Sequence, residues 1–200
     1  MLKLIVAQHT KPAVGDTRTM ALSATMRRFE ITLADSDREV YESLELRVAQ
    51  HPSESERYLV ARVVARALEH AEGLEFSKGG VSDDTEPALV QRDLRGDLVA
   101  WIEIGAPTPD RLHKATKASP RVVIYTWKDP EGQVEAIRER KVYKADTIEL
   151  NALPPEFLDA IIPTLDRVNR WELSVAGGAL YLTINGTLVE GAVSKHQIDR

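Results

Sequence analysis

The stretch from residue 98 to residue 104, Leu-Val-Ala-Trp-Ile-Glu-Ile, constrains the fold more than any other part of the chain. Side chains alternate between the two faces of a strand, and here both faces are apolar except at Glu103. A strand that is apolar on both faces is typical of the centre of a sheet that is covered on both sides. Glu103 is therefore predicted to be buried, where a carboxylate must be paired, hydrogen-bonded or bound to a metal.

Residues 86–90 are predicted to form a neighbouring strand, which a turn through Gly96 connects to the first. Carboxylates gather around this pair of strands, at Asp83, Asp84, Glu86, Asp97 and Glu103. Oxygen ligands held close together suit a hard divalent cation such as Mg²⁺. An acidic protein also carries acidic turns without a function, and Asp83 and Asp97 fit that description better. For Glu103, a functional role and a structural ion pair both stay open.

The pattern of the whole chain predicts a mixed β-sheet flanked by helices, in the α/β or α+β class. An antiparallel hairpin is expected near the N-terminus, over residues 22–33 and 44–48. An antiparallel meander is expected from Trp171 onward, with turns at Gly177-Gly178 and Asn185-Gly186. Helices are predicted to begin at Ser53, Thr108, Asp129 and Pro155, the first with Glu56 completing a capping box and the last continuing to about Val168.

Composition limits the class of protein. The chain has 200 residues, of which 43% are hydrophobic and 28% charged, and it contains no cysteine. This excludes disulfides and thiolate metal sites. The sequence holds no apolar run approaching the roughly 20 residues of a membrane helix, so no membrane partner and a cytoplasmic location are predicted. Residues 1–19 are interpreted as a disordered or artefactual extension, and residues 20–200 as a single domain beginning at Met20.

A formal net charge of −5 opposes indiscriminate nucleic-acid binding, so a nucleic-acid partner would need a local basic patch. Two basic stripes qualify: Arg111, His113, Lys114, Lys117 and Arg121, and then Arg138, Arg140, Lys141 and Lys144. Either stripe could contact phosphates, although solvated helix faces are the commoner use. Lys114 follows Glu103 by eleven residues and could reach the end of its strand, or it could pair with Asp110 on the helix surface.

An ordered set of short motifs resembles the bacterial YaeQ family and covers most of residues 20–190. The matching pieces are Met20–Thr25, His51–Glu54, Asp84–Pro87, Trp101–Gly105 with Pro107, Lys114-Ala115 and Val123–Tyr125. That family is similar in fold to the PD-(D/E)XK nuclease superfamily, so the resemblance implies a mixed sheet flanked by helices. The superfamily places an acid after a proline on one strand, and an acid, any residue and a lysine on the next.

The resemblance implies site residues position by position. Glu103 matches the second acid, whereas Ala88 and Gly105 stand where the first acid and the lysine are expected. Glu86 or Asp84 would replace the first acid, Lys114 the lysine, and Glu54 would match an acid that the first helix sometimes contributes.

Two functions follow from these assignments. The first is a metal-dependent nuclease or phosphodiesterase with an altered site, in which Glu86 and Glu103 bind Mg²⁺ and Lys114 stabilises the attacked phosphate. The alternative is a non-catalytic protein that binds nucleic acid or a protein partner on the same fold, with Arg111, Lys114 and Lys117 as the nucleic-acid contacts. Fold similarity alone does not decide between them.

Overall fold

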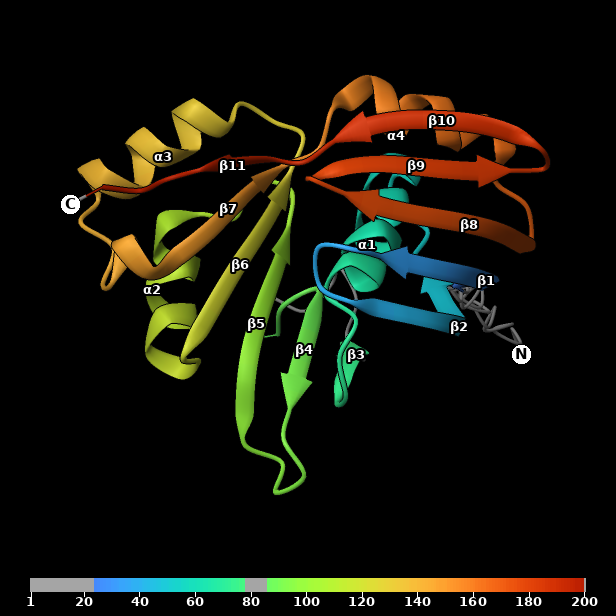
Figure 1. The fold of residues 1–200 in the computed structure, drawn as a ribbon. Coiled ribbons are helices and arrows are strands. Elements are labelled where there is room, and N and C mark those ends of the chain that lie inside the picture. Colours follow the sequence, from blue (N-terminus) through green and yellow to red (C-terminus); the bar gives the residue numbers. More distant parts are fainter. Residues whose placement is uncertain (1–23, 78–85, 200) are drawn as a thin grey trace, which may run out of the picture.

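The computed structural model describes residues 24–77 and 86–199, which form two β-sheets with helices between and outside them (Figure 1). The predicted extension at residues 1–19 and the predicted ligand Asp84 lie outside the described residues. No helix within the described ranges has the length and hydropathy needed to cross a lipid bilayer. The cytoplasmic location stays a prediction.

The first sheet has the strand order β10-β9-β8-β1-β2. Its strands are β1 (Thr25–Asp35), β2 (Val40–Gln50), β8 (Val168–Ala176), β9 (Ala179–Ile184) and β10 (Thr187–Ala192). The predicted N-terminal hairpin is confirmed, because β1 and β2 pair antiparallel. The predicted meander is confirmed too, since β9 pairs antiparallel with both β8 and β10. β1 and β8 run parallel, so this sheet joins the two ends of the chain.

The second sheet has the strand order β11-β7-β6-β5-β4-β3. Its strands are β3 (Leu74–Phe76), β4 (Leu89–Arg92), β5 (Leu98–Ile104), β6 (Arg121–Thr126), β7 (Ile148–Ala152) and β11 (Ser194–His196). β5 lies between β4 and β6, in the interior position that its two apolar faces predict. The crossover helices α2 (Pro109–Ala118) and α3 (Pro130–Glu139) pack on one face of this sheet through a shared apolar cluster (Figure 1).

Helix α1 (Glu56–Leu68) lies between the two sheets and buries every side chain from Leu59 to Leu68. The apolar cluster around it takes Trp171 from the first sheet and Ile102 from the second, so one core holds both sheets together. The shorter α4 (Pro155–Ile161) adds to the same core.

Three predictions about these elements were wrong. The strands form two mixed sheets rather than one. The first helix has Ser55 as its N-cap, because the hydroxyl of Ser53 is bound to Nδ1 of His51 at 2.6 Å and does not cap it. The fourth helix ends at Ile161 and continues as the 3-10 turn η3 (Ile162–Thr164), since Pro163 has no N–H to donate to the helix.

Candidate functional site

Glu103 is buried on β5, with 4% of its surface exposed, and two neighbouring side chains donate to one of its carboxylate oxygens. Its Oε1 accepts one hydrogen bond from Nε1 of Trp101 and one from Nε of Arg111, each at 2.6 Å. Trp101 lies two residues earlier on the same face of the strand, whereas Arg111 comes from the first turn of α2. The structure thus favours the ion-pair interpretation of this carboxylate.

The capping of α2 explains how Arg111 reaches the strand. Thr108 is the N-cap, as predicted, and its Oγ1 accepts a hydrogen bond from the backbone N–H of Arg111 at 3.3 Å. This places Arg111 in the first helical turn, directly after β5. Its Nη2 also donates to the backbone carbonyl of Glu86. Glu86 therefore contacts this cluster through its main chain.

A second buried ion pair forms at the start of α1. Nη2 of Arg62 lies 2.9 Å and 3.0 Å from the two carboxylate oxygens of Glu54. The side chains of both residues are almost fully inaccessible to solvent. Arg62 is a partner that sequence reasoning missed; the available signal was an arginine about two helical turns after an acid, at a position that the apolar face of the helix surrounds.

Burial governs the electrostatics of both carboxylates. Removal from water raises the pKa of Glu103, and the hydrogen bonds from Trp101 and Arg111 act in the opposite direction. Burial likewise raises the pKa of Glu54, against the attraction of Arg62. The charges of both pairs also act on Tyr58. Burial raises the pKa of Tyr58 to about 12, and the charges of both glutamates add to the rise. The charges of Arg62 and Arg111 oppose this rise.

These residues do not fit Mg²⁺. The two buried carboxylates already face guanidinium groups, and a metal would have to displace Arg111 from Glu103. Within residues 24–77 and 86–199, no three side chains of His, Cys, Asp or Glu form a group that could hold a metal ion. The position where the nuclease resemblance expects a lysine is Gly105, whose φ of 91° favours glycine.

Lys114 and Lys117 lie on the exposed face of α2. Neither makes a hydrogen bond or ion pair with any residue of the described ranges, so the side chain that contacts Glu103 is Arg111 and not the predicted Lys114. Leu112 and Ala115 are buried on the opposite face. At 100° per residue, the two lysines occupy the sector between Arg111 on one side and His113 on the other.

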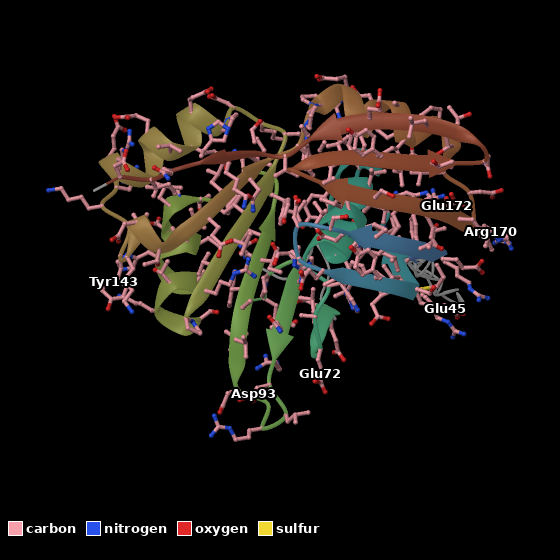
Figure 2. The ribbon with its side chains drawn as sticks, viewed as in Figure 1. Glu45, Glu72, Asp93, Tyr143, Arg170 and Glu172 are labelled. Carbon is pink, nitrogen blue, oxygen red and sulfur yellow. The ribbon has the colours of Figure 1, made fainter. Side chains whose placement is uncertain are left out.

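The structure brings parts of the two predicted basic stripes together at His113, whereas Arg111 and Arg121 of the first stripe are paired with carboxylates elsewhere. Nδ1 of His113 accepts a hydrogen bond from the backbone N–H of Tyr143 at 3.2 Å, and the two rings pack edge to face at 6.4 Å. Tyr143 was not singled out from the sequence, although it stands between Lys141 and Lys144. Tyr143 is 46% exposed and lies at the edge of the molecule (Figure 2).

The loop after α3 holds this tyrosine outward. Lys141 and Lys144 both adopt left-handed backbone conformations, with φ of 49° and 50°, and Val142 between them is buried. Nζ of Lys144 lies 5.4 Å from the centre of the Tyr143 ring. The α2–Tyr143 surface is defined here as the exposed side chains of Lys114, Lys117, Lys141, Tyr143 and Lys144.

Comparison with known proteins gives consistent matches. The family model described as YaeQ protein matches residues 20–193. A protein of Escherichia coli (strain K12) named Uncharacterized protein YaeQ is 27% identical over 165 residues, covering 82% of this chain and 91% of the relative. A Salmonella typhi protein of the same name is 30% identical over 115 residues, covering 58% of this chain and 63% of the relative.

Solved structures show the same architecture. The crystal structure of YaeQ protein from Pseudomonas syringae has a TM-score of 0.80 and 28% identity, covering 86% of this chain and 95% of that one. The YaeQ protein from Xanthomonas axonopodis pv. citri also has a TM-score of 0.80, with 29% identity, covering 88% of this chain and 100% of that one. The mixed α+β fold with two sheets is therefore shared.

Proposed function

The chain belongs to the YaeQ family, and we propose that it binds single-stranded nucleic acid through the α2–Tyr143 surface without cleaving it. The observation that carries this proposal is the contact between His113 and Tyr143, which unites basic residues about thirty positions apart into one surface. Lysines neutralise phosphates, and an exposed aromatic ring stacks on unpaired bases. The surface offers both kinds of contact.

The local charge of this surface contrasts with that of the whole chain. All four charged members of the surface are lysines, whereas the full sequence has a formal net charge of −5. Asp110 is the one acid of α2, and it lies in the first turn, where the positive end of the helix stabilises it. The proposal therefore predicts binding that is weak, confined to one face and strongly dependent on salt.

The absence of cleavage is proposed because the candidate catalytic carboxylates are engaged elsewhere. Glu103 and Glu54 each form an ion pair with a buried or half-buried arginine. The lysine expected in the strand is replaced by Gly105. A protein of this kind would keep a nuclease-like arrangement of strands for binding alone.

Fluorescence anisotropy with a labelled single-stranded DNA or RNA oligomer tests the proposal. Replacing Lys114, Lys117 and Lys144 by glutamine should weaken binding and reduce the slope of log K against log salt by about 2, at roughly 0.7 per phosphate contact. Tyr143→Ala should weaken binding by about tenfold at every salt concentration, because it removes a stacking platform.

The matched control removes three arginines from other surfaces, with Arg47, Arg95 and Arg167 replaced by glutamine. All three are exposed, so this control changes the net charge by the same amount while leaving the α2–Tyr143 surface intact. An equal loss of binding in both triple variants would contradict the proposal, since the effect would then follow from net charge alone. A protein partner is the remaining interpretation if no oligomer binds.

The second candidate is the metal-dependent phosphodiesterase, with Glu86 and Glu103 as Mg²⁺ ligands and Lys114 at the phosphate; it requires Arg111 to leave Glu103 before a metal binds. It is favoured by the position of Glu103 on a central strand and by the second buried carboxylate, Glu54, near the same Tyr58. Incubation with DNA and RNA in Mg²⁺ or Mn²⁺ decides between the candidates. Cleavage that disappears in Glu103→Ala would establish the enzyme, and binding without turnover would establish the first proposal.

A further inference from the structure

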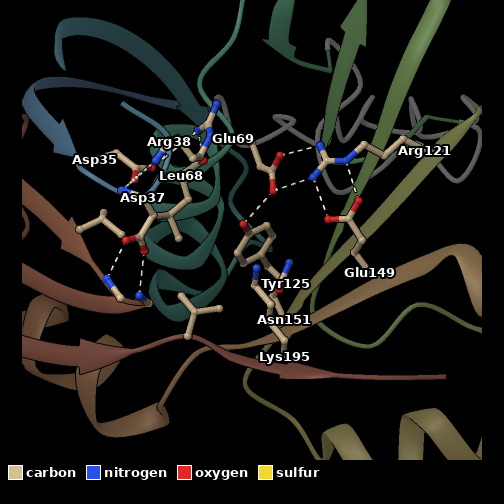
Figure 3. Close-up of a pocket in the computed structure, with 14 residues that line it drawn as sticks. Asp35, Asp37, Arg38, Leu68, Glu69, Arg121, Tyr125, Glu149, Asn151 and Lys195 are labelled. Atoms are coloured by element: carbon tan, nitrogen blue, oxygen red, sulfur yellow. Dashed lines mark hydrogen bonds and ion pairs between the residues drawn. The ribbon is translucent and has the colours of Figure 1, made fainter. Parts of the chain in front are cut away.

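A cavity of about 660 Å³ opens where the first sheet, the end of α1 and the strands β6, β7 and β11 meet (Figure 3). It contains no residue of the α2–Tyr143 surface and neither Glu103 nor Glu54. Its size falls in the range of small-molecule sites, which runs from about 300 to 1,000 Å³. Some polar side chains of its wall form hydrogen bonds or ion pairs with one another, and others make no such contact with the described residues.

Arg121 is fully engaged within the wall. Its guanidinium binds Glu149 at 2.7 Å through Nε and Glu69 at 2.7 Å through Nη1, as Figure 3 shows. The hydroxyl of Tyr125 donates to Glu69 at 2.8 Å. Because two carboxylates share one guanidinium, this triad retains one uncompensated negative charge facing the cavity.

Asn151 is a polar residue of the wall whose side chain is not engaged by the described part of the protein. It is 5% exposed, and its amide makes no hydrogen bond with any residue in the described part of the chain. On the sheet it lies directly between Tyr125 of β6 and Lys195 of β11, so all three side chains share the face that lines the cavity (Figure 3). Because the amide faces the cavity and has no partner among the described residues, it can donate to and accept from a ligand or water there.

Lys195 is the second uncommitted group. Its ammonium is exposed at the rim and makes no hydrogen bond or ion pair with the described residues. Its charge acts on Asp37, whose carboxylate already accepts hydrogen bonds from the backbone N–H groups of Gly177 and Gly178 at 2.6 and 2.8 Å. Lys195 and Asn151 therefore provide hydrogen-bond donors to the cavity, and the Glu69–Arg121–Glu149 triad provides a net negative charge.

We propose that this cavity binds a small zwitterion of the free amino-acid class. The ligand's carboxylate would accept hydrogen bonds from the Lys195 ammonium and the Asn151 amide. Its ammonium group would lie against the Glu69–Arg121–Glu149 triad, where it compensates the remaining negative charge. A purely anionic ligand would meet the carboxylates, and a purely cationic ligand would leave the two donors unused.

Isothermal titration calorimetry on the full chain tests this proposal with three zwitterions, L-alanine, L-glutamine and L-lysine. Butyrate and propylamine serve as probes that carry one charge each. At least one amino acid should bind, and about tenfold more tightly than either singly charged probe. Absence of binding by all three amino acids at millimolar concentration, or equal binding by a singly charged probe, would overturn the proposal.

Two variants locate the site. Lys195→Gln removes the exposed ammonium, and Asn151→Leu replaces the amide by an apolar group of similar volume; each should weaken binding at least about tenfold. Thermal unfolding of both variants shows whether the fold is retained. Arg47→Gln, at an exposed position of β2 outside the cavity, is the matched control and should bind like the parent protein. Unchanged affinity in both cavity variants would place the binding elsewhere and reject the proposal.

Discussion

At the scale of single residues, the ion pair between Glu103 and Arg111 is the most informative feature. The apolar run around Glu103 is sufficient to predict its burial. The partner is harder to predict, because it comes from another element and depends on where α2 begins relative to the end of β5. Thr108 marks that beginning, so an arginine three residues later was a usable signal, and Lys114 is nearly a full turn too far along the helix.

Removing Arg111 should be costly because it leaves a buried carboxylate without its counter-charge. We expect Arg111→Met to lower the free energy of unfolding by about 3 kcal/mol, measured by urea denaturation at neutral pH. The double variant Glu103→Gln with Arg111→Met should recover most of this loss, since it removes the charge that was left unpaired.

Arg95→Met is the matched control for this measurement. Its side chain is 81% exposed, so its ion pairs are screened by solvent and the change should stay within about 0.5 kcal/mol of the parent protein. An Arg111→Met protein as stable as the Arg95→Met control would contradict the importance assigned to the buried pair.

At the scale of elements, local capping signals predict the helices that they dominate. Thr108-Pro109 and Asp129-Pro130 mark the starts of α2 and α3, and the structure confirms both caps. The prediction failed where a neighbouring side chain competes, as His51 does for Ser53 at α1. It also missed the exposed Tyr143, because two left-handed residues in a loop leave little trace in hydrophobic periodicity.

The cap at Thr108 should contribute measurably to stability. Thr108→Ala removes the acceptor for the backbone N–H of Arg111, and we expect it to lower the free energy of unfolding by about 1 kcal/mol. Thr108→Ser keeps a hydroxyl at the same position and should lose much less. Equal losses in the two variants, measured by urea denaturation, would show that the methyl group and not the hydrogen bond stabilises the helix.

At the scale of the whole molecule, strands can be recognised from sequence more readily than the sheet to which each belongs. Most of the strands were predicted, yet their division into two sheets was not, because it depends on the long-range parallel pairing of β1 with β8. The mixed α+β architecture agrees with the solved YaeQ structures. The relation to the PD-(D/E)XK superfamily stays a prediction.

The shared core predicts that both sheets unfold together. Trp171 reports on the first sheet, and Trp101 and Trp127 report on the side of the second, while one apolar cluster spans both. In a Trp171→Phe variant, urea unfolding followed by tryptophan fluorescence should coincide with unfolding followed by far-ultraviolet circular dichroism. Separate midpoints for the two signals would mean that the sheets unfold independently.

The parallel pairing of β1 with β8 also sets the order of events during synthesis. Arg28 lies opposite Val168 in this register, so about 140 residues must leave the ribosome before β1 gains its second neighbour. Until then the N-terminal hairpin presents an unpaired strand edge, which other chains can recognise. Because pairing between such distant segments closes slowly, the edge of β1 stays open to such contacts until the C-terminal strands have been made.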